Sequence, residues 1–160
     1  MGLEISYYKN AEFVKDFTSY NDMEDEDLVY VSNEAFPARL GDMKPGLYKA
    51  ECVDGFRAGS YGGYNHWRRE LCNLIYGMTD QAFWDSPIAE STQPFVELIN
   101  MADNEGTIGT SVCAKLAKDF NDHADKIKDA PLDDYWKEKA ECWHTAFTEA
   151  GNNNGFVDFH

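Results

Sequence analysis

The sequence has no long apolar run and little of what covalent catalysis or zinc binding requires. No apolar stretch approaches the roughly twenty residues that a membrane-spanning helix needs. The cysteines are Cys52, Cys72, Cys113 and Cys142, and none forms a C-x-x-C pair, which argues against the usual structural zinc motifs. No serine lies in a G-x-S-x-G context. We therefore expect a cytoplasmic protein with reduced thiols and no covalent hydrolase chemistry.

Basic side chains are also scarce. The chain has 29 acidic residues against 14 basic ones, a formal net charge of −15. A field of that sign repels nucleic-acid phosphates and anionic lipid surfaces, so we expect no direct nucleic-acid binding and no membrane association. It favours a basic protein partner or a cation. The alternative is that the charge serves only solubility.

The length of 160 residues predicts a single domain over 1–160. Residues 1–27 carry few signals of regular structure and are expected to be irregular. Residue types and spacing then predict strands at 28–32, 47–53 and 156–159 and a loop from 54 to 63. Helical spacing predicts helices at 64–76, after Pro94, across 112–127 with a cap at Thr110 or Ser111, and after Pro131. The predicted fold class is α+β, with about four helices packed on a small antiparallel sheet of N-terminal strands and a C-terminal strand.

The first candidate site is a glycine- and arginine-rich segment at 57–69. All four arginines of this acidic chain lie between Arg39 and Arg69. A glycine-rich loop that leads into a helix presents backbone N–H groups to an anion, and aromatic rings beside it can stack on a base. The alternative is an ordinary turn with paired arginines. The candidate ligand-binding residues are Arg57, Ser60, Tyr61, Tyr64, Asn65, His66, Trp67 and Arg68.

The second candidate site is an acidic segment at 103–119. Asp103 and Glu105 are two residues apart and can face one side of an extended loop, and Asp119 follows on the next predicted helix. Three carboxylates suit a hard divalent cation such as Mg²⁺ or Ca²⁺. An EF-hand is excluded, because Met101 and Val112 would occupy ligand positions. The alternative is an acidic loop before a helix.

Several segments resemble those of an uncharacterised family of small bacterial and phage proteins. The resemblance extends over roughly residues 57–160, and its clearest segments are Gly59–Arg68, Leu98–Gly109, Lys115–Phe120 and Phe156–His160. It implies a bacterial or phage setting and brings no catalytic role.

Two functions follow as hypotheses. The first is a non-catalytic acidic protein that binds a basic protein, as immunity proteins, inhibitors and DNA mimics do. Its expected contact residues are Glu24–Asp27, Asp122, Asp125, Asp129, Asp133 and Asp134. The second is a protein that binds a small anionic ligand such as a nucleotide, or a metal-assisted hydrolase, built from the segments 57–69 and 103–119.

Overall fold

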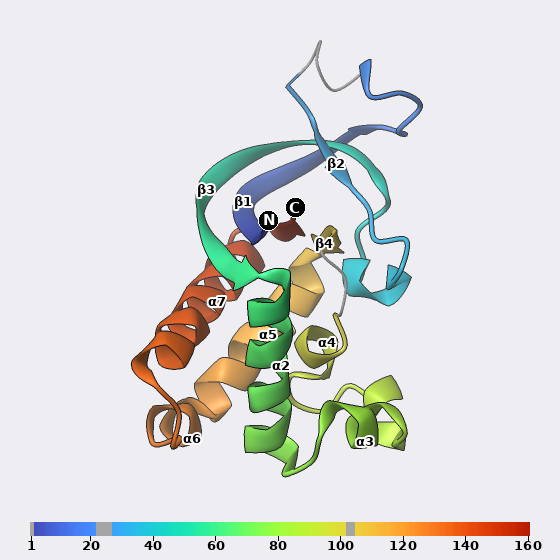
Figure 1. Ribbon diagram of the computed structural model, residues 1–160. Helices are drawn as coiled ribbons and strands as arrows, with labels where there is room; N and C mark the ends of the chain where they lie inside the picture. Colours follow the sequence, from blue (N-terminus) through green and yellow to red (C-terminus); the bar gives the residue numbers. More distant parts are fainter. Residues whose placement is uncertain (1, 22–26, 102–104) are drawn as a thin grey trace.

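The computed structural model describes residues 2–21, 27–101 and 105–160 (Figure 1). The strands are β1 (Gly2–Lys15), β2 (Val29–Val31), β3 (Gly46–Ser60), β4 (Gly106–Ile108) and β5 (Phe156–Phe159). The α-helices are α2 (Tyr61–Tyr76), α3 (Asp80–Trp84), α4 (Val96–Ile99), α5 (Thr110–Asp122), α6 (Ala124–Lys128) and α7 (Asp134–Asn152). Two short 3-10 helices, η1 (Pro37–Leu40) and η2 (Pro87–Glu90), complete the described elements.

The five strands form one antiparallel sheet in the order β2-β3-β1-β5-β4. Helices lie together beside this sheet, and α2, α5 and α7 are the long ones (Figure 1). The predicted α+β class, with N-terminal and C-terminal strands in one sheet, is confirmed. The described residues contain six α-helices rather than about four, because α3 was not predicted and one predicted helix is divided in two.

The N-terminal segment is not irregular over Gly2–Lys15, where it forms the central strand β1. Leu3, Ile5 and Tyr7 alternate with less buried residues and point into the helix-covered core. This period of two is the pattern of a strand with one apolar face. The residues between them are largely polar, so the overall composition of the segment does not reveal the alternation. For this reason the prediction of an irregular segment was wrong.

The predicted loop from 54 to 63 is also wrong, because β3 continues through it as far as Ser60. Its glycines allow close backbone packing and an unusual strand conformation. A Cβ atom at Gly55 would lie 2.7 Å from the carbonyl oxygen of Ile5 on the neighbouring strand. Gly59 has a φ of +124°, a backbone conformation that residues other than glycine rarely adopt. Glycine here therefore indicates a strand pressed against β1.

The helices occur in the predicted regions of the chain but differ at their ends. In α2, Ser60 caps the N-terminus and Gly77 ends the helix in a left-handed conformation. The helix predicted across 112–127 divides into α5 and α6 at His123, whose Nδ1 lies 2.9 Å from the carbonyl oxygen of Asp119. Neither residue proposed as its cap has that role, since α5 follows Gly109 without a side-chain cap.

Two apolar clusters lie on opposite faces of the sheet. The larger one joins β1 and β5 to the long helices and contains Trp67, Trp143 and Phe147, all fully buried. The smaller one fills the inside of the curve and consists of Val31, Leu40, Tyr48 and Phe156. Packing on both faces explains why a chain with this many charges folds: its apolar residues are concentrated in the strands and on the inner helix faces.

The sheet curls until its two edge strands meet. The Thr107 N–H donates to the Ser32 carbonyl over 2.8 Å, and the Ser32 N–H donates to the Thr107 hydroxyl over 3.3 Å. The Asn33 amide also donates to the Thr107 carbonyl over 3.1 Å. Figure 1 shows the strong curvature of β1 and β3 that brings the ends of the sheet together. These contacts bring β2 and β4, which belong to opposite edges, to a common mouth.

Candidate functional site

The glycine- and arginine-rich segment forms the end of β3 and the first turns of α2 rather than an open loop. Arg57 is exposed on the strand, and its Nη1 lies 3.1 Å from Oε1 of Glu4. The Ser60 hydroxyl accepts a hydrogen bond from the Gly63 N–H over 2.9 Å. That backbone donor is thus already used by the helix cap, as in many helix N-termini.

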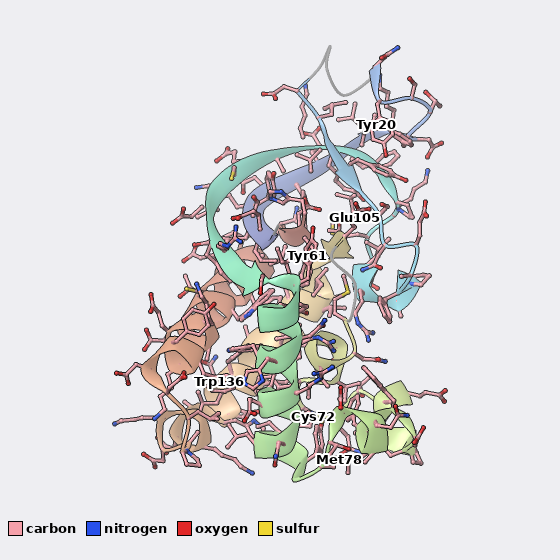
Figure 2. The ribbon with its side chains drawn as sticks, in the orientation of Figure 1. Tyr20, Tyr61, Cys72, Met78, Glu105 and Trp136 are labelled. Atoms are coloured by element: carbon pink, nitrogen blue, oxygen red, sulfur yellow. The ribbon has the colours of Figure 1, made fainter. Side chains whose placement is uncertain are left out.

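The aromatic residues proposed to stack on a ligand are core residues. The Tyr64 hydroxyl is buried and donates to the Met101 carbonyl over 2.8 Å. The Trp67 indole N–H donates to the Trp136 carbonyl over 3.0 Å, and the Trp136 indole returns the bond to Trp67 over 3.2 Å. Figure 2 labels Trp136 beside α2, where the two indoles stack with centroids 5.3 Å apart. Neither tryptophan has a ring face free for a nucleotide base.

Two of the four arginines contact α4, Arg68 as a buried residue and Arg39 as a half-buried one. Arg68 is 4% exposed and donates to the Ile99 carbonyl and, over 2.7 Å, to the side-chain oxygen of Asn65. Arg39 donates from Nε to the Glu97 carbonyl over 2.8 Å. Burial lowers the pKa of both guanidinium groups. Positive charge here complements the carbonyl end of the helix, so these arginines hold the fold together.

The remaining candidates of this segment lie near the surface. Tyr61 is half-buried at the start of α2, as Figure 2 shows. His66 is exposed and lies 3.9 Å from Glu70 in an i, i+4 pair. Arg69 pairs with Asp80 over 2.8 Å. The two exposed guanidinium groups therefore each face a carboxylate, and those of Arg39 and Arg68 face carbonyl oxygens, so the arginines do not form one open anion site.

The acidic segment does not assemble around a cation in the described residues. Asp103 lies outside them, and Glu105 is exposed just before β4. Asp119 is buried on α5, where it accepts from the Phe95 N–H over 3.0 Å and pairs with Lys115 over 2.8 Å. Across 2–21, 27–101 and 105–160, no three histidine, cysteine or acidic side chains are placed to hold a metal ion.

Asp119 instead supports the backbone next to α4. Lys115 also contacts Oε1 of Glu97 over 2.6 Å, so one ammonium group bridges two mostly buried carboxylates. Phe95, which receives the bond from Asp119, has a positive φ of 63°. A residue with a side chain adopts that conformation only when its surroundings enforce it. The network therefore fixes the entry to α4.

A pocket of about 440 Å³ opens where the two edges of the sheet meet. Tyr30 and Ser32 line it from β2 and the residue after that strand, and Thr107 and Asp158 line it from β4 and β5. Two further carboxylates, Glu34 and Glu105, lie at its walls, with Tyr20, Ala35, Gly106, Phe159 and His160. Figure 2 places Glu105 next to β4 and Tyr20 beyond the end of β1. None of the described residues that line this pocket is a lysine or an arginine.

Asp158 is the most unusual group in the pocket. Its neighbours in β5, Val157 and Phe159, point into the helix-covered core, so Asp158 lies on the inner face of the curl. Burial raises the pKa of Asp158 to about 7, and a hydrogen bond from the Thr107 hydroxyl at 3.4 Å opposes this only in part. Burial, and secondarily the charge of Asp158, raises the pKa of Tyr8 on β1. This carboxyl group changes its charge near neutral pH.

The sequence reasoning missed Asp158, together with Glu34, Thr107 and the two tyrosines of the pocket. One signal was available for Asp158. An acidic residue in the run Phe-Val-Asp-Phe interrupts a strand whose other members are all buried. Of the predicted site residues that the structure describes, only Glu105 lines this pocket.

Three of the four thiols are poorly suited to catalysis or metal binding, and the fourth, Cys52, is exposed on β3 and belongs to no cluster of possible metal ligands among the described residues. Cys72 and Cys113 are fully buried, and burial raises the pKa of Cys72 to about 11 and that of Cys113 still further. Burial also raises the pKa of the half-buried Cys142. A thiol that resists ionisation is a poor nucleophile and a poor metal ligand.

Comparison with protein-family models, curated protein sequences and solved structures gives no match. The resemblance to small bacterial and phage proteins therefore stays a prediction. None of the helices that the structure describes is long and apolar enough to cross a membrane.

Proposed function

We propose that this chain is a non-catalytic acidic protein that binds a basic protein partner in the cytoplasm, as an inhibitor, immunity protein or DNA mimic does. The observation that carries the proposal is how the charges are used inside the molecule. Among the described residues, many of the basic side chains form ion pairs or hydrogen bonds within the molecule, whereas many carboxylates have no cationic partner. A surface of this kind attracts basic proteins and steers their approach.

Many of the basic side chains have a partner within the molecule. Lys9, Lys44 and Lys118 pair with nearby carboxylates. Lys115 bridges two carboxylates, and the four arginines have the contacts described above. Lys137 donates to the Lys128 carbonyl. Among the described residues, five lysines form no ion pair, and they are far fewer than the carboxylates without a cationic partner; they are Lys49, Lys126, Lys128, Lys137 and Lys139.

Several of the described carboxylates, by contrast, have no cationic partner. Around α6 and α7, Asp125, Asp129 and Asp134 are exposed and form no ion pair. Asp133 is exposed too, although its side chain caps α7 by accepting from the Trp136 N–H. Of the other expected contact residues, Asp122 pairs with Lys118, Asp27 is exposed, and 24–26 lie outside the described residues.

The alternative, a pocket for a small anionic ligand or a metal-assisted hydrolase, has less support. It requires free guanidinium groups and a cluster of carboxylates. The arginines already have partners, and Asp119 is buried in a structural ion-pair network.

The test is to capture the partner and measure its affinity for this chain at about 50 mM and about 300 mM salt. We expect a basic protein whose dissociation constant rises at least about tenfold over that interval, because salt screens exposed charges. The paired substitutions Asp125→Asn and Asp129→Asn should weaken binding. The matched control, Lys126→Gln with Lys128→Gln in the same helix, should strengthen it.

An acidic partner, or an affinity that salt and these substitutions leave unchanged, would contradict the proposal.

A further inference from the structure

Three features of the pocket at the meeting edges of the sheet suit a cation: its carboxylates, its aromatic rings and its size. Its carboxylates come from three separate segments: Glu34 follows β2, Glu105 precedes β4, and Asp158 lies in β5. Within the part of the chain that the structure describes, none of the three forms an ion pair, and His160 is the one basic side chain that lines the pocket. The negative charge gathered there is thus not neutralised from within the molecule.

The backbone holds Asp158 in place, and its carboxyl group accepts only one long hydrogen bond. Both of its neighbours in the strand are buried, so the backbone fixes the carboxyl group toward the pocket. Its one hydrogen bond, from the Thr107 hydroxyl, is long at 3.4 Å. A largely buried carboxyl group with one poor donor is normally stabilised by a cation or by strong hydrogen bonds. A cation entering the pocket supplies what the chain itself does not.

An aromatic wall adds the second kind of contact. Tyr30 lines the pocket and stacks on Phe17 with ring centroids 4.1 Å apart. Tyr20 packs edge-on against the same Phe17 and is 70% exposed. Ring faces attract ammonium and, more often, guanidinium groups, and arrangements of aromatic rings with carboxylates recognise organic cations. Phe17 fixes both tyrosines beside the mouth.

The size of the pocket is the third constraint. A volume of about 440 Å³ falls in the lower half of the range of small-molecule sites. It suits one long side chain with a few water molecules and excludes a helix or a folded segment. The mouth lies where the two edge strands meet, next to the exposed Tyr20, so a side chain that projects from a protein surface can reach it.

We propose that this pocket receives a lysine or arginine side chain of the basic partner, with Asp158 as its ionic contact and Tyr20 and Tyr30 as its aromatic contacts. The inference rests on the proposed function and specifies the site at which this chain recognises the partner. Overall charge attracts the partner, and the pocket selects a partner whose cationic side chain is free to enter. Such an anchored charged contact has the character of a binding hot spot.

The first experiment uses small probes and does not need the partner. Nα-acetyl-arginine amide is titrated into ¹⁵N-labelled protein at about pH 8, and the citrulline amide of the same shape but no charge is the matched ligand control. We expect millimolar binding, with amide shifts centred on Thr107, Phe159 and His160 and none from the citrulline amide. Asp158→Asn should weaken binding at least about tenfold, whereas Asp125→Asn, which removes the same charge from an exposed helix, should leave it unchanged.

Three results would overturn the inference. The citrulline amide could bind equally well, the shifts could scatter over the acidic surface, or Asp158→Asn could bind the arginine amide as the natural chain does.

The second experiment separates this inference from the proposed function. With the captured partner, Asp158→Asn should raise the dissociation constant far more than Asp125→Asn does. If salt-sensitive binding of a basic partner persists and Asp158→Asn has no effect, the pocket fails and the proposed function stands. If the arginine amide binds and no basic protein does, the pocket serves a free organic cation. The proposal that a protein partner supplies the cationic side chain is then wrong.

Discussion

Replacing Asp158 with asparagine should stabilise the protein at alkaline pH far more than at acidic pH. Burial raises the pKa of Asp158 from 3.8 to about 7 in the folded chain, so the folded state holds this proton more tightly than the unfolded state does. For a group shifted in that direction, stability is greatest below the unfolded pKa and falls as pH rises through the folded pKa. Asparagine keeps the shape of the side chain and never ionises.

The expected size follows from the shift. A change of one pKa unit corresponds to about 1.4 kcal/mol, so a shift of about three units gives a loss of about 4 kcal/mol between about pH 4 and about pH 8. The free energy of unfolding of Asp158→Asn, minus that of the natural chain, should therefore grow by about that amount across the interval. Most of the growth should occur between about pH 5 and about pH 7.

The assay is urea unfolding at half-unit pH steps, with both proteins measured in the same buffers. Other titratable groups surround Asp158: Tyr8 of β1 interacts with its charge, and the pocket is lined by Tyr20, Tyr30, Glu34, Glu105 and the His160 imidazole. They are present in both proteins, so their titration cancels in the difference to first order. Asp125→Asn is the matched control, because its carboxylate is exposed and unpaired, and its difference from the natural chain should stay flat with pH.

A difference between Asp158→Asn and the natural chain that changes by less than about 1 kcal/mol across the interval would refute the reasoning. It would mean that water or a neighbouring donor stabilises the ionised carboxylate, and that Asp158 has no need of a cation.

Two further predictions concern residues that the fold uses differently from what the sequence indicated. Arg68→Met should destabilise the chain by about 2–4 kcal/mol in urea unfolding, because it leaves buried acceptors unpaired. The control Arg57→Gln changes an exposed arginine and should alter the free energy of unfolding by less than about 1 kcal/mol. Equal effects of the two substitutions would show that Arg68 is not structural. Gly55→Ala should cost about 1–3 kcal/mol because its new methyl group would lie 2.7 Å from the Ile5 carbonyl oxygen. The control Gly62→Ala, in a helix with no atom within 4 Å of the new Cβ, should be neutral or stabilising, and a neutral Gly55→Ala would mean that β3 and β1 are not pressed together there.

The α+β class and most of the elements could be predicted because local patterns carry them. The stripe of Trp67 and Leu71 in α2, with Gly77 at its end, is visible in the sequence and is found in the structure. The strand at 156–159 is likewise where it was predicted. Periodicity of apolar residues and chain-ending glycines are local signals, so tertiary contacts are not needed to recognise them.

The roles of individual polar residues could not be predicted in the same way. Arg68 and Asp119 resemble site residues in the sequence, yet the fold buries both in contacts with segments that are distant along the chain. Charged residues gathered in sequence can be separated by the direction in which each side chain points. The arginine-rich segment therefore indicated a ligand where the structure has caps and ion pairs.

By itself the sequence determined the excess of negative charge, the fold class and the faces of the long helices, because composition and periodicity are properties of the chain read in order. Only the tertiary structure decided where an acidic pocket exists. That pocket forms because the curl of the sheet brings Ser32 against Thr107, 75 residues later, and turns Asp158 toward the same mouth. The bending of a sheet depends on packing across its two faces, and no local pattern of residues records where its edges will meet.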